Sequence, residues 1–233
     1  MGYPHPAIDD LLLDSVNQAK DRYVIVQIGA RHGAYLIKSS HLLVKLKPSL
    51  DSILIGVEAS PSGYSNLLSS MERNGLNVPS NIFRNVAISD TIASIKFFED
   101  GVSSHIVNHT PEDANERIVD VESTTIEEIL KDVNHVDFLE MDIQGAEYQA
   151  IPCATAVLSE KVRMICIRTH GNRANEDALY NLIGNLGWQP VLFCYHLTPV
   201  VINGEETPLI DGILCWVNTN LREPCCINFS QYF

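Results

Sequence analysis

"VIVQIGARHGAYLI", residues 24–37, reads as a buried strand that enters a glycine-punctuated turn and then opens a helix. Gly29 and Gly33 bracket the turn, where glycine lets the backbone approach a ligand closely and adopt φ angles that other residues resist. The spacing G-x-x-x-G differs from the dinucleotide fingerprint G-x-G-x-x-G. Because many strand-to-helix turns contain two glycines, the turn alone indicates a nucleotide-like ligand without identifying it.

The composition is that of one acidic α/β domain. The 233 residues carry a formal charge of −13 and show no linker-like shift, so we expect a single domain over residues 1–233. An acidic chain lacks the basic stripe that meets phosphates, so we expect a small-molecule acceptor and no nucleic-acid partner. No apolar run is long enough to span a membrane, and no basic start of a signal peptide is seen, which predicts no membrane partner and a cytoplasmic location.

Hydrophobic periodicity predicts alternating strands and helices over most of the chain. Residues 1–22 are expected to form an N-terminal helical extension, and the polar residues 100–116 a loop that could serve as a lid. The predicted helices span residues 8–19, 34–46, 63–74, 125–131, 145–158 and 175–186. The predicted strands span residues 23–28, 52–58, 81–89, 94–99, 117–122, 136–141, 162–169, 189–197 and 212–218.

The end of the chain decides between two nucleotide-binding folds. Only the turn-rich residues 203–208 separate the last two strands, and strands without a crossover helix must pair antiparallel. Seven sheet strands, mostly parallel, with helices on both faces and a C-terminal antiparallel hairpin, outline the Rossmann-like class I methyltransferase fold. An NAD-dependent dehydrogenase would keep alternating strands with helices. In such sheets a ligand lies at the carboxyl ends of the first and fourth strands.

Two acidic stretches follow predicted strands at that edge. In "LIGVEASP", residues 54–61, Glu58 comes about thirty residues after the turn, where a carboxylate can accept hydrogen bonds from both hydroxyls of a ribose. In "VDFLEMDIQGAEY", residues 136–148, Glu140, Asp142 and Gln144 alternate and would share one side of an extended chain. Together with the glycine turn, these side chains predict a site for an adenosine-containing cofactor.

An ordered set of motifs resembles the FkbM family of S-adenosylmethionine-dependent methyltransferases. The motifs are VQIGARHGAY, GVEASPSGYSNL, NVAISD, GVSS, STTIEEIL, DFLEMDIQGAE and CIRTHG, and the resemblance covers about residues 23–190. The order of the motifs and the gaps between them carry the resemblance. The usual family pattern is D-x-G-A-N-x-G after the first strand and K-x-D-x-E-G-A-E after the fourth.

The resemblance implies S-adenosylmethionine as cofactor and gives roles to individual residues. The glycine turn would cradle the amino-acid part of the cofactor, and Glu58 would hold its ribose. Asn85 and Ala87 would lie near the adenine, and Ser103 and Ser104 near the methionine end. The expected cofactor-binding residues are Gln27, Gly29, Ala30, Arg31, Gly33, Glu58, Ala59, Ser60, Asn85, Ala87, Ser103, Ser104, Asp142, Gln144 and Gly145, and the expected catalytic residues are His170, Asp142 and Glu147.

Three positions depart from the family pattern. Gln27 replaces the acid of the first strand, which in methyltransferases generally orients the ammonium group of the cofactor. The amide brings no charge, so cofactor binding would weaken by about 1–2 kcal/mol unless another carboxylate substitutes. Glu140 replaces a lysine and Gln144 replaces a glutamate, which predicts a pocket retuned for a different acceptor or a disabled one.

Methyl transfer needs an aligned acceptor and, for a hydroxyl, a base. His170 is the expected base because unperturbed histidine titrates near neutrality, with Asp142 or Glu147 orienting it or holding the acceptor. His32, inside the turn, would contact cofactor or acceptor, or face solvent. No metal is expected, since no defined ligand set demands one, although Asp142 and Glu147 would permit a divalent ion.

The leading hypothesis is an O-methyltransferase that acts on a hydroxyl of a small metabolite or sugar-like acceptor. N-methylation fits the polar pocket as well, and a homodimer is kept as a hypothesis. The departures at Gln27, Glu140 and Gln144 make a non-catalytic protein that binds S-adenosylmethionine or S-adenosylhomocysteine the main alternative. A nicotinamide-dependent oxidoreductase is disfavoured by the missing fingerprint and by the terminal hairpin.

Overall fold

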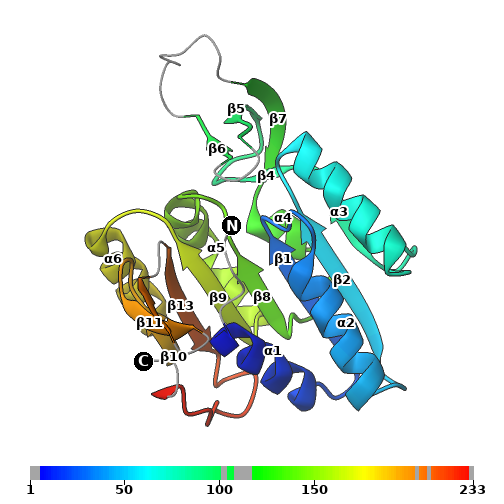
Figure 1. Ribbon diagram of the computed structural model, residues 1–233, viewed down its shortest axis with the longest axis vertical. Coiled ribbons are helices and arrows are strands. Elements are labelled where there is room, and N and C mark those ends of the chain that lie inside the picture. Colours follow the sequence, from blue (N-terminus) through cyan, green and yellow to red (C-terminus); the bar gives the residue numbers. More distant parts are fainter. Residues whose placement is uncertain (1–5, 101–103, 108–116, 203–204, 209–210, 231–233) are drawn as a thin grey trace.

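The computed structural model describes residues 6–100, 104–107, 117–202, 205–208 and 211–230. Its centre is a seven-stranded sheet with the strand order β10-β13-β9-β8-β1-β2-β3 (Figure 1). The strands are β1 (Arg22–Ile28), β2 (Asp51–Val57), β3 (Ile82–Arg84), β8 (Phe138–Met141), β9 (Met164–Thr169), β10 (Gln189–Cys194) and β13 (Gly212–Val217).

The sheet is parallel except at one strand. β1 pairs parallel with both β2 and β8, and β8 pairs parallel with β9. β13 runs antiparallel between β9 and β10. The predicted antiparallel pairing of the last two main strands is therefore confirmed, and so is the predicted fold class. The strand order reverses beside β1, which places a ligand site at the carboxyl ends of β1 and β8.

The connection between β10 and β13 differs from the prediction. Residues 189–197 are not one strand, because β10 ends at Cys194 and Leu197 takes a left-handed φ of 62° in a turn. Residues 205–208, expected to be part of a turn, form β12 (Glu205–Pro208), which pairs antiparallel with β11 (Pro199–Ile202). The β-branched run from Val200 to Ile202 favours this extra hairpin.

Helices cover both faces of the sheet. Side chains of the first three helices pack into one apolar cluster, and those of the other three pack into a second cluster on the opposite face. Among the described residues, no helix is both long and apolar enough to cross a membrane. The first group is α1 (Pro6–Gln18), α2 (Ala34–Leu46) and α3 (Pro61–Arg73), and the second is α4 (Ile126–Leu130), α5 (Glu147–Lys161) and α6 (Arg173–Gly184).

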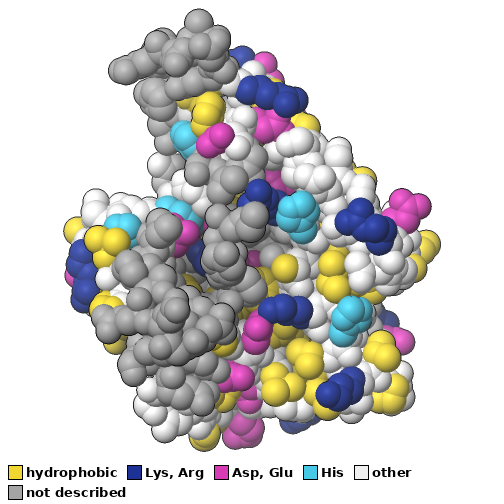
Figure 2. Space-filling view, viewed as in Figure 1, with side chains coloured by type: hydrophobic (Ala, Val, Ile, Leu, Met, Phe, Trp, Pro, Cys, Tyr) yellow, Lys and Arg dark blue, Asp and Glu magenta, His cyan; other side chains and the backbone are white. Residues whose placement is uncertain are grey.

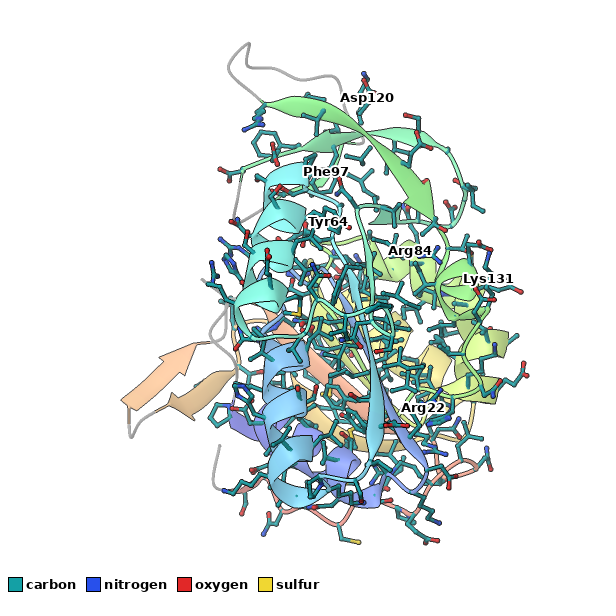
Figure 3. All side chains as sticks on the ribbon, turned by 90° about the vertical axis from the view of Figure 1, so that its right-hand side faces the viewer. Arg22, Tyr64, Arg84, Phe97, Asp120 and Lys131 are labelled. Carbon is teal, nitrogen blue, oxygen red and sulfur yellow. The ribbon has the colours of Figure 1, made fainter. Side chains whose placement is uncertain are left out.

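A small second sheet stands beyond the main one, past the start of α3 (Figures 1 and 3). The predicted strand 81–89 breaks after Arg84, because the chain leaves the main sheet there and joins the second one at Ala87. Within the expected lid, residues 105–106 form a strand, whereas residues 101–103 and 108–116 lie outside the described residues. The second sheet consists of β4 (Ala87–Ile88), β7 (Ile118–Thr124), β5 (Ser94–Phe98) and β6 (His105–Ile106).

A buried carboxylate ties three strands together at the amino edge of the main sheet. Asp137 is 3% exposed; its Oδ2 accepts a hydrogen bond from the Val24 amide (2.8 Å) and its Oδ1 one from Arg163 Nη1 (2.6 Å). His135 Nε2 lies 3.2 Å from Oδ2. Losing such an acceptor leaves buried donors unpaired, so this edge depends on one side chain.

Asp137→Ala should lower the free energy of unfolding by about 2–3 kcal/mol, because it leaves the Val24 amide and Arg163 without their buried acceptor. Urea denaturation measures the loss. Asp120→Ala is the control: its ion pair with Lys96 is more than half exposed, and Figure 3 shows Asp120 pointing away from the domain. We expect that variant to lose less than about 0.5 kcal/mol. Equal losses in the two variants would contradict the assignment.

Candidate active site

The glycine turn between β1 and α2 is held in a left-handed conformation. The φ angles of Gly29, Arg31 and Gly33 are 77°, 48° and 69°. A Cβ atom at Gly29 would collide with the carbonyl oxygen of Asp142, so the exits of β1 and β8 touch only because this residue is glycine. The amides of Gly29 and Ala30 both donate to the carbonyl of Val57, which fixes the turn against the end of β2 (2.9 and 3.0 Å).

Glu58, directly after β2, joins the turn to the start of α3. Its Oε2 accepts a hydrogen bond from the Arg31 amide (2.8 Å) and its Oε1 one from the Ser60 amide (2.9 Å). Burial raises the pKa of this carboxyl, although both hydrogen bonds oppose the shift. A carboxylate has about four acceptor positions, so two remain after these bonds are made. Glu58 can therefore still accept the two hydroxyls of a ribose.

The second sheet contacts the same region through Glu99. This carboxylate, 6% exposed, accepts hydrogen bonds from Ser60 Oγ (2.6 Å) and the Ser62 amide (2.9 Å), and its other oxygen pairs with Arg117 Nε at 2.9 Å. Burial would raise the pKa of Glu99, but these contacts outweigh it and lower the pKa. Ser60, which also caps α3, thus lies between the two sheets, and its expected contact with the cofactor stays a prediction.

The other residues expected to bind the cofactor lie on both sides of this contact. Asn85 donates from its amide to the carbonyls of Glu58 and Ala59 (2.8 and 2.9 Å), so it shapes the loop that carries the predicted ribose ligand. Ala87 is buried in β4, and Ser104 Oγ accepts from the Asp100 amide (3.0 Å). Ser103 lies outside the described residues. The roles of these residues toward adenine and methionine remain predictions.

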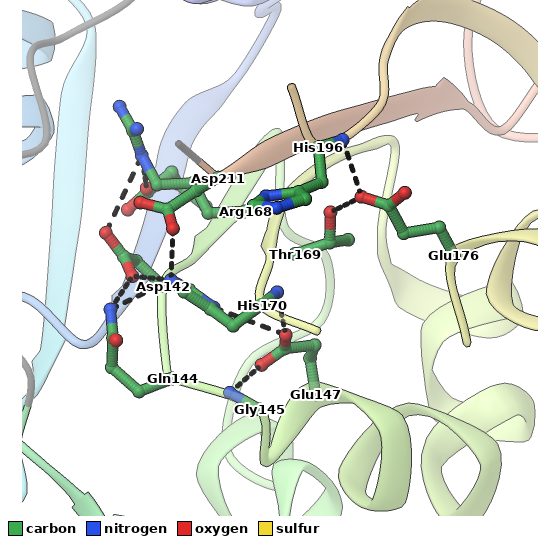
Figure 4. Close-up of polar contacts among 11 residues, drawn as sticks. Asp142, Gln144, Gly145, Glu147, Arg168, Thr169, His170, Glu176, His196 and Asp211 are labelled. Carbon is green, nitrogen blue, oxygen red and sulfur yellow. Dashed lines mark hydrogen bonds and ion pairs between the residues drawn. The ribbon is translucent and has the colours of Figure 1, made fainter. Parts of the chain in front are cut away.

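A histidine surrounded by carboxylates forms the other half of the site (Figure 4). His170, just after β9, has Nε2 at 3.2 Å from Asp142 and 3.7 Å from Asp211, while its Nδ1 is 3.3 Å from Glu147 Oε1. The Gln144 amide nitrogen lies 2.8 Å from His170 Nε2. Side chains from the ends of β8, β9 and β13 therefore meet at one point. Within the part of the chain that the structure describes, no group of three or more His, Cys, Asp or Glu residues has the geometry of a metal site.

The protonation of His170 differs from the prediction. Burial disfavours the imidazolium, but hydrogen bonds and charge from Asp142 and Glu147 outweigh it and raise the pKa of His170 to about 10. Burial likewise opposes ionisation of Asp142, yet His170 and Arg168 lower the pKa of this carboxyl. The expectation that His170 titrates near neutrality is wrong, because that expectation used the reference pKa of a solvated imidazole. A pKa this high favours the imidazolium at neutral pH.

Glu147, at the start of α5, holds His170 in position. It is fully buried, and its Oε1 accepts a hydrogen bond from the His170 amide while its Oε2 accepts one from the Gly145 amide, both at 2.8 Å. The expected alternation of Glu140, Asp142 and Gln144 along an extended chain is wrong for Gln144, since the strand ends at Met141 and Gln144 has a left-handed φ of 53°. A turn, not pleating, brings Gln144 to Asp142.

Sequence reasoning gave no role at the site to Arg168 or Asp211. Arg168 Nε lies 3.6 Å from Asp142 Oδ2 and 3.8 Å from Glu140 Oε1, with a side chain that is 8% exposed. Asp211 precedes β13, and Gly212 pairs with Thr169 at the carboxyl edge. An antiparallel strand starts where its parallel neighbours end, so the predicted hairpin was the signal that could have located Asp211.

Residues 27–190, more than half of the chain, match the family described as the methyltransferase FkbM domain. The chain belongs to the FkbM methyltransferase family. Membership of this family implies S-adenosylmethionine as the methyl donor, and the nicotinamide-dependent alternative is wrong. Among curated proteins, no sequence matches the chain.

Solved structures share the fold of this FkbM-family methyltransferase at low sequence identity. The methyltransferase FkbM from Methylobacillus flagellatus KT aligns with a TM-score of 0.57 and 17% identity over 84% of this chain. The alignment covers only 44% of that protein, so this chain spans less than half of its length. A precorrin-6y C5,15-methyltransferase from Geobacter metallireducens GS-15 aligns with a TM-score of 0.52 and 10% identity, over 91% of this chain and 87% of the other. The human methyltransferase 10 domain containing protein aligns with a TM-score of 0.51 and 11% identity, over 94% of this chain and 84% of the other.

Glu58→Ala should abolish binding of S-adenosylmethionine, because it removes the predicted acceptor for the ribose and the acceptor of the Arg31 and Ser60 amides. Calorimetric titration with S-adenosylmethionine measures this loss. Circular dichroism and thermal unfolding of the same samples establish that the variant is folded. Equal affinity in the wild type and in Glu58→Ala would refute the ribose assignment.

Proposed function

We propose that this FkbM-family methyltransferase methylates a hydroxyl group on a small polar acceptor of the metabolite or sugar-like class. The observation that carries the proposal is the arrangement of Asp142 and Asp211 around His170 at the carboxyl edge of the sheet. The side chains of both aspartates are nearly one-third exposed, so they offer hydrogen-bond acceptors to an incoming hydroxyl.

The bound cofactor supplies an electrophilic methyl group on a sulfonium. On the protein side, Asp142 accepts the hydrogen bond of the acceptor hydroxyl and takes its proton as the oxygen–carbon bond forms. His170 remains an imidazolium that holds Asp142 and Glu147 in fixed positions and stabilises their charges. The structure thus supports Asp142 as the proton acceptor, where the sequence had favoured His170.

The residues present suit the cofactor. Gly29 lets the turn lie against the Asp142 carbonyl with no side chain between them, and Glu58 keeps acceptor positions for a ribose. The proposed cofactor site extends from this turn across Asp142, Gln144 and Gly145 toward His170. These contacts are supported by position and remain part of the proposal.

The surface supports a small acceptor in place of a nucleic acid. The formal charge is −13, and on the face shown in Figure 2 the Lys and Arg side chains are scattered among acidic and neutral ones and form no continuous stripe. A partner that presents many phosphates would meet no matching basic surface on this face. A cytoplasmic location and a homodimer belong to the same proposal.

An amine acceptor is the second candidate. The carboxylates around His170 would attract an ammonium group as readily as they accept a hydroxyl. The two candidates differ in when the acceptor loses a proton. An ammonium group must lose it before it can attack the methyl group, whereas a hydroxyl loses it during the attack. Transfer of labelled methyl to matched amino and hydroxyl sugars separates the two classes.

With saturating S-adenosylmethionine, the rate of hydroxyl methylation should be nearly constant between about pH 7 and 9 and should fall as His170 loses its proton near pH 10. The reason is that Asp142 is ionised throughout this range and His170 keeps the proton with which it holds Asp142. Transfer of labelled methyl from S-adenosylmethionine to a panel of polyhydroxylated acceptors gives the pH profile. A rate that climbs toward pH 10 would instead identify His170 as the base.

His170→Ala should leave S-adenosylmethionine affinity within about twofold and slow methyl transfer by roughly 100-fold, since positioned proton-transfer groups contribute about that factor. Single-turnover transfer and calorimetry on the same preparation measure both quantities. His135→Ala is the matched control, because His135 contacts a carboxylate at the opposite edge of the sheet. A large loss of cofactor affinity in His170→Ala would place this residue in the cofactor site.

A further inference from the structure

Three polar side chains from adjacent strands of the main sheet lie close together near the glycine turn: Gln27, Glu140 and Arg168. Gln27 on β1 is the direct register partner of Glu140 on β8, and their side chains hydrogen-bond to each other. Arg168 on β9 places its Nε 3.8 Å from Glu140 Oε1. These three residues are 5%, 2% and 6% exposed, so they form a buried polar row within the sheet.

Two acceptor atoms in this row have no hydrogen-bond partner among the described residues. They are Gln27 Oε1 and Glu140 Oε2, both shielded from solvent. Buried acceptors in native proteins are nearly always paired, and an unpaired one needs an explanation. Arg168 approaches the other oxygen of Glu140, so it does not satisfy Oε2. A ligand with an ammonium group could donate hydrogen bonds to both atoms.

The acid in this row stands one strand away from its position in the family pattern that the sequence resembles. That pattern has an acid on the first strand, where this chain has Gln27, and a lysine on the fourth strand, where it has Glu140. Here the acid stands on β8 and the base, Arg168, stands on β9. Because Gln27 and Glu140 are register partners, the acid has moved only to the neighbouring strand and still lies next to the turn.

We propose that Glu140 supplies the negative charge that holds the α-ammonium group of S-adenosylmethionine, with the Gln27 carbonyl oxygen as a second acceptor and Arg168 as the residue that positions Glu140. The inference rests on the cofactor site and not on the acceptor chemistry. A failed methyl-transfer assay would therefore leave it standing. Glu140 is thus a cofactor-binding residue, and the changes at positions 27 and 140 compensate each other.

The proton equilibrium of Glu140 agrees with this role. Burial and the charge of Asp142 raise the pKa of Glu140 to about 8, against the opposing effects of Arg168 and Gln27. From α2, Tyr35 also faces this carboxyl. A cation bound beside Glu140 favours the ionised form and lowers its pKa again. Binding of a ligand with an ammonium group should therefore release a proton at pH 7.

The test compares two ligands that differ in the amino-acid part. S-Adenosylhomocysteine carries the α-ammonium group, whereas methylthioadenosine keeps the adenosine and lacks it. In calorimetric titrations, Glu140→Gln should weaken S-adenosylhomocysteine binding at least tenfold and change methylthioadenosine binding less than twofold. Proton release on binding S-adenosylhomocysteine, measured in buffers of different ionisation enthalpy, should fall in the same variant. Equal weakening of both ligands, or none, would overturn the proposal.

Two further variants keep the test independent of folding defects. Glu176→Gln makes the same change at a glutamate that is 1% exposed and hydrogen-bonds Thr169, and it should leave the affinity ratio of the two ligands unchanged. Gln27→Asp/Glu140→Lys restores the family arrangement and should bind S-adenosylhomocysteine at least tenfold more tightly than Glu140→Lys alone. If the double variant binds S-adenosylhomocysteine no more tightly than Glu140→Lys alone, the proposed compensation between positions 27 and 140 is overturned.

Discussion

The contact between Gly29 and the carbonyl oxygen of Asp142 is the constraint on which the site depends. Adjacent parallel strands end at the same edge, but side chains normally keep their exits apart. Here the absence of a side chain lets the backbone after β1 lie directly against the backbone after β8. The turn that carries the predicted cofactor ligands and the loop that carries Asp142 consequently form one surface. Glu58 is fixed to that surface by the Arg31 amide, and His170 is fixed to it by Asp142.

Most of the main sheet could be predicted because its signals are local. Apolar runs with β-branched residues gave the strands, and helical spacing gave the six helices to within a few residues at their ends. The antiparallel ending followed from the lack of a helix before residue 212. The strand expected over residues 81–89 failed for a tertiary reason. The Asn85 amide donates hydrogen bonds to the loop after β2, and the chain then leaves the main sheet for the second one. No local sequence pattern encodes this change of sheet.

The candidate site was predictable where its residues follow strand ends, and not where its chemistry depends on register. Glu58, Asp142 and Glu147 were found from position along the chain. The partnership of Gln27 with Glu140 depends on which residues face each other across β1 and β8, and it appears only in the folded sheet. The pKa of His170 likewise reflects two carboxylates brought together by the fold, Asp142 after β8 and Glu147 at the start of α5. The reference pKa of an isolated imidazole does not include the effect of these carboxylates.

The insertion of β13 between β9 and β10 separates two tasks in the chain. Elements from β1 to β9 provide the glycine turn, the predicted ribose ligand Glu58 and the buried polar row. Asp211 lies in the segment that leads into β13 and contacts His170 from there. None of the predicted cofactor-binding residues belongs to that segment. Changes in the length or composition of the stretch between β10 and β13 can therefore alter the surroundings of His170 while the predicted cofactor-binding residues stay unchanged. In evolutionary terms, this stretch is a place where acceptor preference can diverge without loss of the methyl donor.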